Sequence, residues 1–455
     1  MRRTIATIAA LATVAILVAA CTGAGVLPTW MPDASTGPIG DPTYTRTASS
    51  TGPPAATPAP TLSTSSPDAW LVVGRKGVGG LEVVLASTGE RLYELPSGVP
   101  SADWGRLVAA TATSGRTAVR DLVVQPGFGG PERALDGAWR LPTIGADPTP
   151  VGVSADGQTI VLVEDRVADA AVRTSRFAIL TRGFVRAPRI VTLTGSFEYD
   201  AISPNGATLY VVQHLAGTSS GRYQVRAVDV ASGVLREGVV ADKRNLAEPM
   251  AGWPIAQVRQ DDGAVFTLYR GVAHPFVHAL DTVNGTAVCI DLPATGVDDA
   301  AAVNDWGLAA SPDGRSIYAA NATFGRLEEL DPAGLGIRRS VSLRPLAAGG
   351  IVLAKFGHQD SGPVGRRVAV GPDGRAIYAA GAGGILMIDA ADLAVTDRFL
   401  VGMPVEAIAV TPDGGTLYAL LRDGGRIVKL DAATGNIVGH VPSSGYDRLL
   451  AVVPW

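Results

Sequence analysis

The chain has 455 residues, 38 of them Lys or Arg and 42 Asp or Glu, so its formal net charge is −4. Proteins that recognise nucleic acid present a basic patch, and no run of like charge occurs here, so we expect no nucleic-acid partner. The chain has only two cysteines, Cys21 and Cys289, but at this length it buries enough apolar surface to fold without disulfides.

The first 21 residues follow the pattern of an export signal. Arg2 and Arg3 precede an uncharged stretch rich in Ala, Ile, Leu and Val. The stretch ends Val18-Ala19-Ala20-Cys21, which resembles the bacterial lipobox. This resemblance implies that Cys21 is acylated and holds the protein on the cell membrane or elsewhere in the envelope, outside the cytoplasm. The alternative is an uncleaved anchor, because the stretch lies at the lower limit for crossing a bilayer.

Residues 22–67 are rich in Thr, Pro, Ser, Gly and Ala and have little apolar periodicity. A segment of this composition cannot build a core, so we expect a disordered, partly extended tether between the lipid anchor and a folded head.

Residues 68–455 contain a repeated turn motif. SPDGRSIYAAN begins at residue 311, GPDGRAIYAAG at 371 and TPDGGTLYALL at 411. Weaker copies give one turn residue every forty to sixty positions, a period typical of stacked structural units. The seven turn residues are Asp103, Asp156, Asn205, Asp262, Asp313, Asp373 and Asp413.

A second turn recurs in each unit, as in LDTVNGTAV from 280 and LDAATGNIV from 430. Two turns flanked by apolar alternating runs predict four antiparallel strands per unit, and a ring of such units is an all-β propeller. Residues 69–96 supply three strands and YDRLLAVVPW supplies one, so we predict that strand 447–453 completes this blade and closes the ring. The prediction is eight blades, with seven as the alternative.

The motifs S-P-D-G-x-x-[LI]-Y and L-D-x-x-T-G resemble the YVTN-type bacterial propellers, which are similar to WD-repeat proteins. The resemblance covers about 385 residues and implies the fold rather than an activity. Quinoprotein propellers place a Trp four residues after the T-G of each turn, and the matching position here is Gly439. We therefore expect no cofactor.

The family resemblance places a ligand site at the mouth of the central channel, where the innermost strands begin. Counting seven residues back from each turn residue selects positions with charged or aromatic side chains. They are Glu198, Trp306, Arg366 and Glu406, with Arg448 as the equivalent in the closing strand. Such a ring of side chains could hold an anionic or peptide-like ligand through Arg contacts and stacking. The alternative is that these are ordinary solvated strand ends.

No catalytic motif or metal-ligand cluster is evident. His274 and His278 lie four residues apart but lack a carboxylate nearby in sequence, so we expect no metal site there, and we expect Cys289 to be a small buried residue. The sequence thus favours a monomeric binding module for an envelope protein, peptide or glycan. The alternative is a lactonase-like hydrolase that holds a divalent cation with Asn304, Asp305, Asp200 and Glu406.

Overall fold

The computed structural model of the chain describes residues 68–75, 77–124, 129–144, 150–165, 174–215, 222–240, 250–271, 274–293, 305–344 and 366–453. The chain divides into two units, Met1–Leu62 and Ser63–Trp455, and all described residues belong to the second. The predicted lipid site Cys21 and tether 22–67 therefore lie outside the described residues. No helix within these ranges has the length and apolar character required to cross a bilayer.

The described residues form antiparallel β-sheets, interrupted by two 3-10 turns, η1 (Arg182–Phe184) and η2 (Asp423–Gly425). Six sheets have four strands each. In order along the chain, the first three are formed by β1 (Trp70–Arg75), β2 (Leu81–Leu85), β3 (Arg91–Leu95) and the C-terminal β32 (Tyr446–Val453); by β4 (Gly98–Pro100), β5 (Arg106–Thr113), β6 (Arg116–Val123) and β7 (Glu132–Asp136); and by β8 (Trp139–Arg140), β9 (Thr159–Glu164), β10 (Thr174–Thr181) and β11 (Arg189–Thr194).

The other three four-stranded sheets follow in the C-terminal half. They are formed by β20 (Gly307–Ala310), β21 (Ile317–Asn321), β22 (Arg326–Asp331) and β23 (Gly336–Ser342); by β24 (Val368–Val370), β25 (Ala376–Gly381), β26 (Gly384–Asp389) and β27 (Val395–Phe399); and by β28 (Val405–Val410), β29 (Thr416–Leu421), β30 (Arg426–Asp431) and β31 (Ile437–His440).

A seventh sheet has eight strands, which fall into two sets of four. The sets are β12 (Phe197–Ile202), β13 (Thr208–His214), β14 (Arg222–Asp229) and β15 (Val234–Leu235), and β16 (Met250–Arg259), β17 (Ala264–Gly271), β18 (Phe276–Asp281) and β19 (Thr286–Asp291). Only two residue pairs, Arg222↔Ala251 and Tyr223↔Met250, join β14 to β16. We call this junction the seam.

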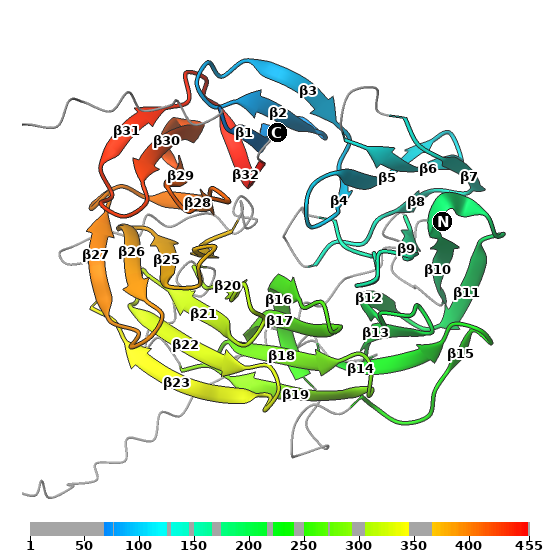
Figure 1. Ribbon diagram of the computed structural model, residues 1–455. Coiled ribbons are helices and arrows are strands. Elements are labelled where there is room, and N and C mark those ends of the chain that lie inside the picture. Colours follow the sequence, from blue (N-terminus) through cyan, green and yellow to red (C-terminus); the bar gives the residue numbers. More distant parts are fainter. Residues whose placement is uncertain are drawn as a thin grey trace, which may run out of the picture. The chain divides into compact units, whose positions relative to one another are not determined.

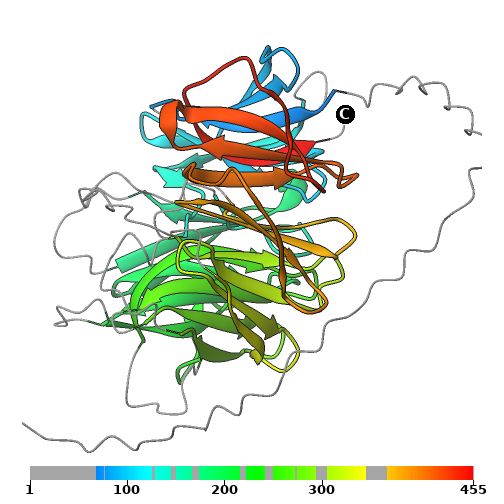
Figure 2. The ribbon, with the colours of Figure 1, turned by 90° about the vertical axis from the view of Figure 1, so that its left-hand side faces the viewer.

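The sheets are arranged around a centre, with strands such as β4, β28 and β32 innermost and strands such as β3, β23 and β27 at the rim (Figure 1). Figure 2 shows the same sheets from the side, where they follow one another around the ring. This arrangement is the all-β propeller that the repeated turns predict. Each sheet is apolar on both faces because it packs between two neighbours.

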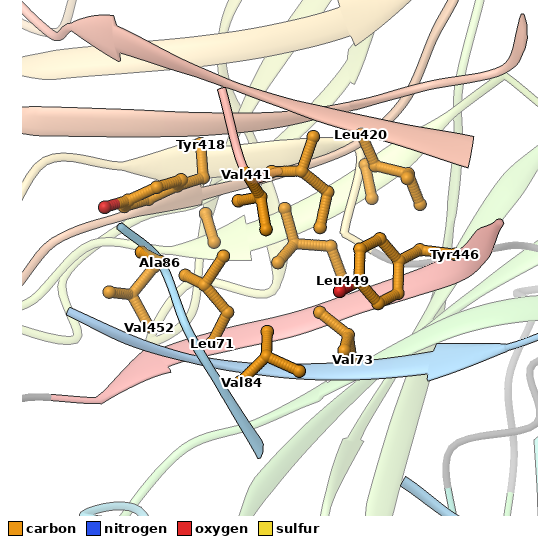
Figure 3. Close-up of a cluster of buried hydrophobic side chains, with 13 residues drawn as sticks. Leu71, Val73, Val84, Ala86, Tyr418, Leu420, Val441, Tyr446, Leu449 and Val452 are labelled. Atoms are coloured by element: carbon orange, nitrogen blue, oxygen red, sulfur yellow. The ribbon is translucent and has the colours of Figure 1, made fainter. Parts of the chain in front are cut away.

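The C-terminal strand pairs with the N-terminal sheet. β32 runs antiparallel to β1, from Trp70↔Val453 to Arg75↔Tyr446, which is the partner that the sequence predicts for strand 447–453. Side chains from β1, β2 and β32 meet those of the neighbouring sheet in one apolar cluster, which includes the fully buried Leu71, Val73 and Leu449 (Figure 3). Apolar burial on this scale is the main stabilising contribution to such a junction.

The repeated turn motif has a clear hydrogen-bonding reason. In the turn at residues 311–316, Ser311 Oγ donates to Asp313 Oδ1, and the same carboxylate accepts from the backbone N of Arg315. Gly314 takes a φ of 69°, which suits glycine. In the turn at Asp103 this position is held by Trp104 with a φ of 57°, which explains why that copy is the weakest match in sequence.

Candidate functional site

A cavity of about 870 Å³ lies between the innermost strands. Residues of β4, β12, β16, β20, β24, β28 and β32 line it, together with the segment 150–157 that precedes β9. Much of the wall consists of Val, Ala, Gly, Ile and Leu. Among the described residues, the charged side chains of the wall are five arginines and two aspartates: Arg182, Arg259, Arg366, Arg367, Arg448, Asp156 and Asp261.

Three of the five predicted site residues line this cavity. Arg366 is exposed just before β24. Arg448 projects from β32, and its guanidinium donates to the backbone oxygens of Val78 and Gly80 at 3.1 and 3.2 Å. Trp306 also lines the cavity, but only 2% of its surface is exposed and it packs in an apolar cluster. Arg366 is therefore exposed at the cavity wall, whereas Arg448 is paired with Asp447 at 3.2 Å and Trp306 mainly fills the core.

Glu198 and Glu406 do not line the cavity. Glu198 is an exposed residue of β12 whose carboxylate lies 3.2 Å from His214 Nε2. This contact lowers the pKa of Glu198 and raises that of His214. Glu406 is buried and accepts from Arg367 at 3.1 Å and from Arg422. The five predicted residues are thus not gathered in one ring.

The five predicted residues do not form one ring because the innermost strands contain β-bulges. The register of β28 against β29 jumps from Val405 to Ala407, which makes Glu406 an extra residue in its strand. Asp200 of β12 and Ile255 of β16 occupy similar bulges. A bulge redirects the side chains around it. Counting back from the turn assumes an unbroken pleat, so it cannot place these side chains at one height.

Glu406 instead belongs to a buried ionic network. The guanidinium of Arg367, 8% exposed, lies 3.3 Å from Asp305 and 3.1 Å from Glu406. Thr323 donates to the other oxygen of Asp305 at 2.6 Å. The network joins residues beside β20, β24 and β28, so it holds three successive sheets together. A buried ion pair of this kind is retained because removing one partner leaves the other uncompensated.

The carboxylates of the hydrolase alternative are dispersed by this network. Asp305 and Glu406 both face Arg367, while Asp200 lies beside His278 of β18. Asn304 lies outside the described residues. Across the part of the chain that the structure describes, no three His, Cys, Asp or Glu side chains are grouped to hold a metal ion.

Arg259 is a cavity residue that the sequence reasoning missed. It is the last residue of β16 and exposed, and it donates to the backbone oxygen of Val153, in the segment before β9. This contact to a different sheet holds its guanidinium in the cavity. Arg366 precedes the first residue of its strand, so Arg259 and Arg366 mark opposite ends of the inner strands. The sequence AQVRQDDG places Arg259 three residues before the turn residue Asp262, and this position could have identified it.

Two other arginines are neutralised locally. Arg182 donates to both carboxylate oxygens of the buried Asp121 at 2.8 and 2.9 Å, and Arg367 is held by Asp305 and Glu406 as described. Arg259 has no acidic partner among the described residues, because its one hydrogen bond goes to a peptide oxygen. An uncompensated guanidinium attracts carboxylates and phosphates.

No protein-family model and no curated protein matches the chain. Solved structures do share its fold. A crystal structure of AztD from Citrobacter koseri matches 85% of this chain and 98% of its own length, with 14% identity and a TM-score of 0.52, and the structure of apo AztD from the same organism gives a TM-score of 0.51 over the same shares at 14% identity. The dihydro-heme d1 dehydrogenase NirN in complex with DHE matches 85% of this chain and 74% of its own, with 15% identity and a TM-score of 0.47. At such identities the likeness establishes the propeller fold alone.

Proposed function

We propose that this protein is an extracytoplasmic β-propeller lipoprotein that binds an anionic or peptide-like ligand of the cell envelope in its central cavity. The observation that carries the proposal is the guanidinium of Arg259, which lines the cavity and has no acidic partner among the described residues, in a chain whose net charge is negative. A cavity of about 870 Å³ with a mostly apolar wall and a few polar groups has the character of a ligand site.

The proposed ring has eight blades and is closed by the C-terminal strand. Eight sets of four strands support this count, if the eight-stranded sheet is divided at the seam, where only two residue pairs connect its halves. The pairing of β32 with β1 supports the closure. A closed ring would place every sheet between two neighbouring sheets, so it would hold the cavity arginines in fixed positions for binding.

The proposed membrane attachment rests on the sequence Val18-Ala19-Ala20-Cys21. Acylation of Cys21 would hold the propeller at the membrane through several lipid chains, which bind far more durably than one. Intact-mass measurement of the protein extracted from membranes should give a mature chain that begins at a lipidated Cys21. Replacing Cys21 with Ala should abolish the lipid, and a wild-type chain with an unmodified Cys21 would contradict the proposal.

Ligand binding can be tested with a defined set of anions. Full-length protein should be screened for thermal stabilisation by carboxylated peptides, phosphorylated sugars and sulfated glycans, with uncharged counterparts of each as comparison. We expect stabilisation by members of the anionic set alone, because a bound ligand stabilises the folded state. Replacing Arg259 or Arg366 with Gln should weaken binding of the best ligand by about 1 to 3 kcal/mol.

Arg375→Gln is the matched control. Its side chain is 88% exposed in the turn before β25, away from the cavity wall. This variant should bind like the wild type. Equal binding by the Arg259, Arg366 and Arg375 variants would place the ligand elsewhere and reject the central cavity as the site.

A further inference from the structure

A second group of chemically active side chains lies at the seam, apart from the central cavity. His278 of β18 and Cys289 of β19 are directly opposite each other in the strand ladder, so their side chains share a face. Met250 is the first residue of β16 and pairs with Tyr223 of β14. The three residues thus come from the same half of the eight-stranded sheet, and Met250 lies where that half meets the other.

The two sulfur atoms and one imidazole nitrogen converge. Cys289 Sγ lies 3.2 Å from Met250 Sδ and 3.8 Å from His278 Nδ1. His278 is fully buried and Met250 is 3% exposed, while Cys289 remains partly exposed. The rings of Tyr223 and Tyr269 stack beside this group, with centroids 5.4 Å apart. The setting is apolar, with one side open toward solvent at the thiol.

The other nitrogen of His278 faces a buried carboxylate. Nε2 lies 3.9 Å from Asp200 Oδ2, and neither atom has a hydrogen-bond partner among the described residues. Asp200 is 1% exposed. The imidazole thus has the sulfur atoms near one nitrogen and a carboxylate near the other, which is the usual arrangement around a metal-binding histidine.

We infer that Cys289, Met250 and His278 form a binding site for one soft monovalent metal ion, copper(I), with Asp200 orienting the imidazole. Thiolate and thioether ligands select copper(I) over harder ions, and imidazole also suits copper. Zinc and calcium sites would need further nitrogen, thiolate or oxygen ligands, and no group of three His, Cys, Asp or Glu exists within the described ranges.

Binding is a simple exchange at Cys289. The S–H bond breaks, a sulfur–metal bond forms, and the proton leaves to solvent, so affinity rises with pH. A nucleophilic role for the Cys289–His278 pair is less well supported. Met250 Sδ occupies the position 3.2 Å from Sγ.

The test uses silver(I), which has the same soft character and needs no reductant. Full-length protein, with and without one equivalent of silver(I), is alkylated with iodoacetamide, and modification is quantified on the peptide that contains Cys289. We expect one bound silver ion by native mass spectrometry. Alkylation of Cys289 should slow by at least about tenfold, because the metal occupies the thiolate. An unchanged alkylation rate in the presence of silver would overturn the site.

Variants separate the three roles. Met250→Leu conserves volume and should weaken silver and anaerobic copper(I) binding by about 10- to 100-fold in competition with a chromophoric chelator, while Met387→Leu in β26 should have no effect. Asp200→Asn should weaken binding by about 10- to 100-fold, as outer partners of metal-binding histidines do. Equal affinity of the Met250 and Met387 variants, or equal protection of Cys289 by zinc(II), would reject a soft-metal site.

Discussion

Two junctions in this propeller join strands from separate parts of the chain, and they are built differently. At the first, β32 pairs with β1 from Trp70↔Val453 to Arg75↔Tyr446, and an apolar cluster covers the contact. At the seam, β14 and β16 share only two residue pairs, and the buried space nearby holds Asp200 and His278 with unpartnered polar atoms.

The difference shows which junction serves stability. The apolar cluster at β1 and β32 contributes favourable burial and contains one buried hydroxyl, that of Tyr446, without a partner among the described residues. At the seam, the titratable groups of Asp200 and His278 are buried without partners, which is more destabilising. Buried polar atoms without hydrogen-bond partners lower stability, and they are expected where a site binds a ligand. The pairing of β32 with β1 therefore contributes more to stability than the seam does.

The largest effect should come from removing the first junction altogether. Deletion of residues 446–455 exposes the edge of β1 and the face of the neighbouring sheet on which β32 packs. We therefore expect the protein to lose its single cooperative unfolding transition and to aggregate. Thermal unfolding followed by circular dichroism and light scattering would measure this. A truncated chain that melts like the wild type would show that β32 is dispensable.

A single side chain tests the apolar character of that junction. Leu449→Ala should lower the free energy of unfolding by about 2 to 5 kcal/mol, because Leu449 is fully buried in the cluster of Figure 3. The matched control is Leu450→Ala, because Leu450 is only partly buried and lines the cavity. Urea denaturation of both variants should give the smaller loss for Leu450, and equal losses would contradict the described register.

A third effect concerns the seam and depends on pH. The pKa of Asp200 is raised to about 7 in the metal-free folded chain, above its unfolded value of 3.8. The folded state therefore holds a proton that the unfolded state has lost, and stability falls as pH rises through this window. Relative to wild type, Asp200→Asn should gain stability between about pH 4 and pH 7, by at most about 1.4 kcal/mol per pH unit.

Asp413→Asn is the control with the opposite sign. Asp413 accepts from Thr411 and from the backbone of Gly415, and these bonds lower its pKa. Its stabilising contribution is present above the unfolded pKa and is lost as pH falls through the folded pKa, so this variant should lose stability relative to wild type as pH rises. Urea titrations across the pH range would measure both. A constant difference between wild type and Asp200→Asn would show that the Asp200 carboxylate is well solvated.

The sequence predicts the sheets well because their turns are local. Asp431 accepts from the backbone of Thr434 three residues on, and Gly435 has a φ of 67°, so a short motif is enough to identify the hairpin. The partner of β32 was also predictable, because an isolated strand at one end of the repeat and a missing strand at the other complete one unit.

The sites were predictable only in part because they depend on details that do not repeat. Arg366 and Arg448 line the cavity as expected, but the bulge at Glu406 turns that side chain toward Arg367. The carboxylate beside His278 is Asp200, which lies 78 positions earlier in the chain, so no local pattern connects them. Contacts between sheets of this kind become visible only in three dimensions.

The pairing of the two ends also constrains when the ring can form. Arg75 donates to the backbone oxygen of Ser444, 369 residues away in the sequence. During synthesis the N-terminal sheet lacks its fourth strand until almost the whole chain has been made, and contacts of such long sequence separation form slowly. An unfinished chain therefore lacks the fourth strand of its N-terminal sheet for most of its synthesis.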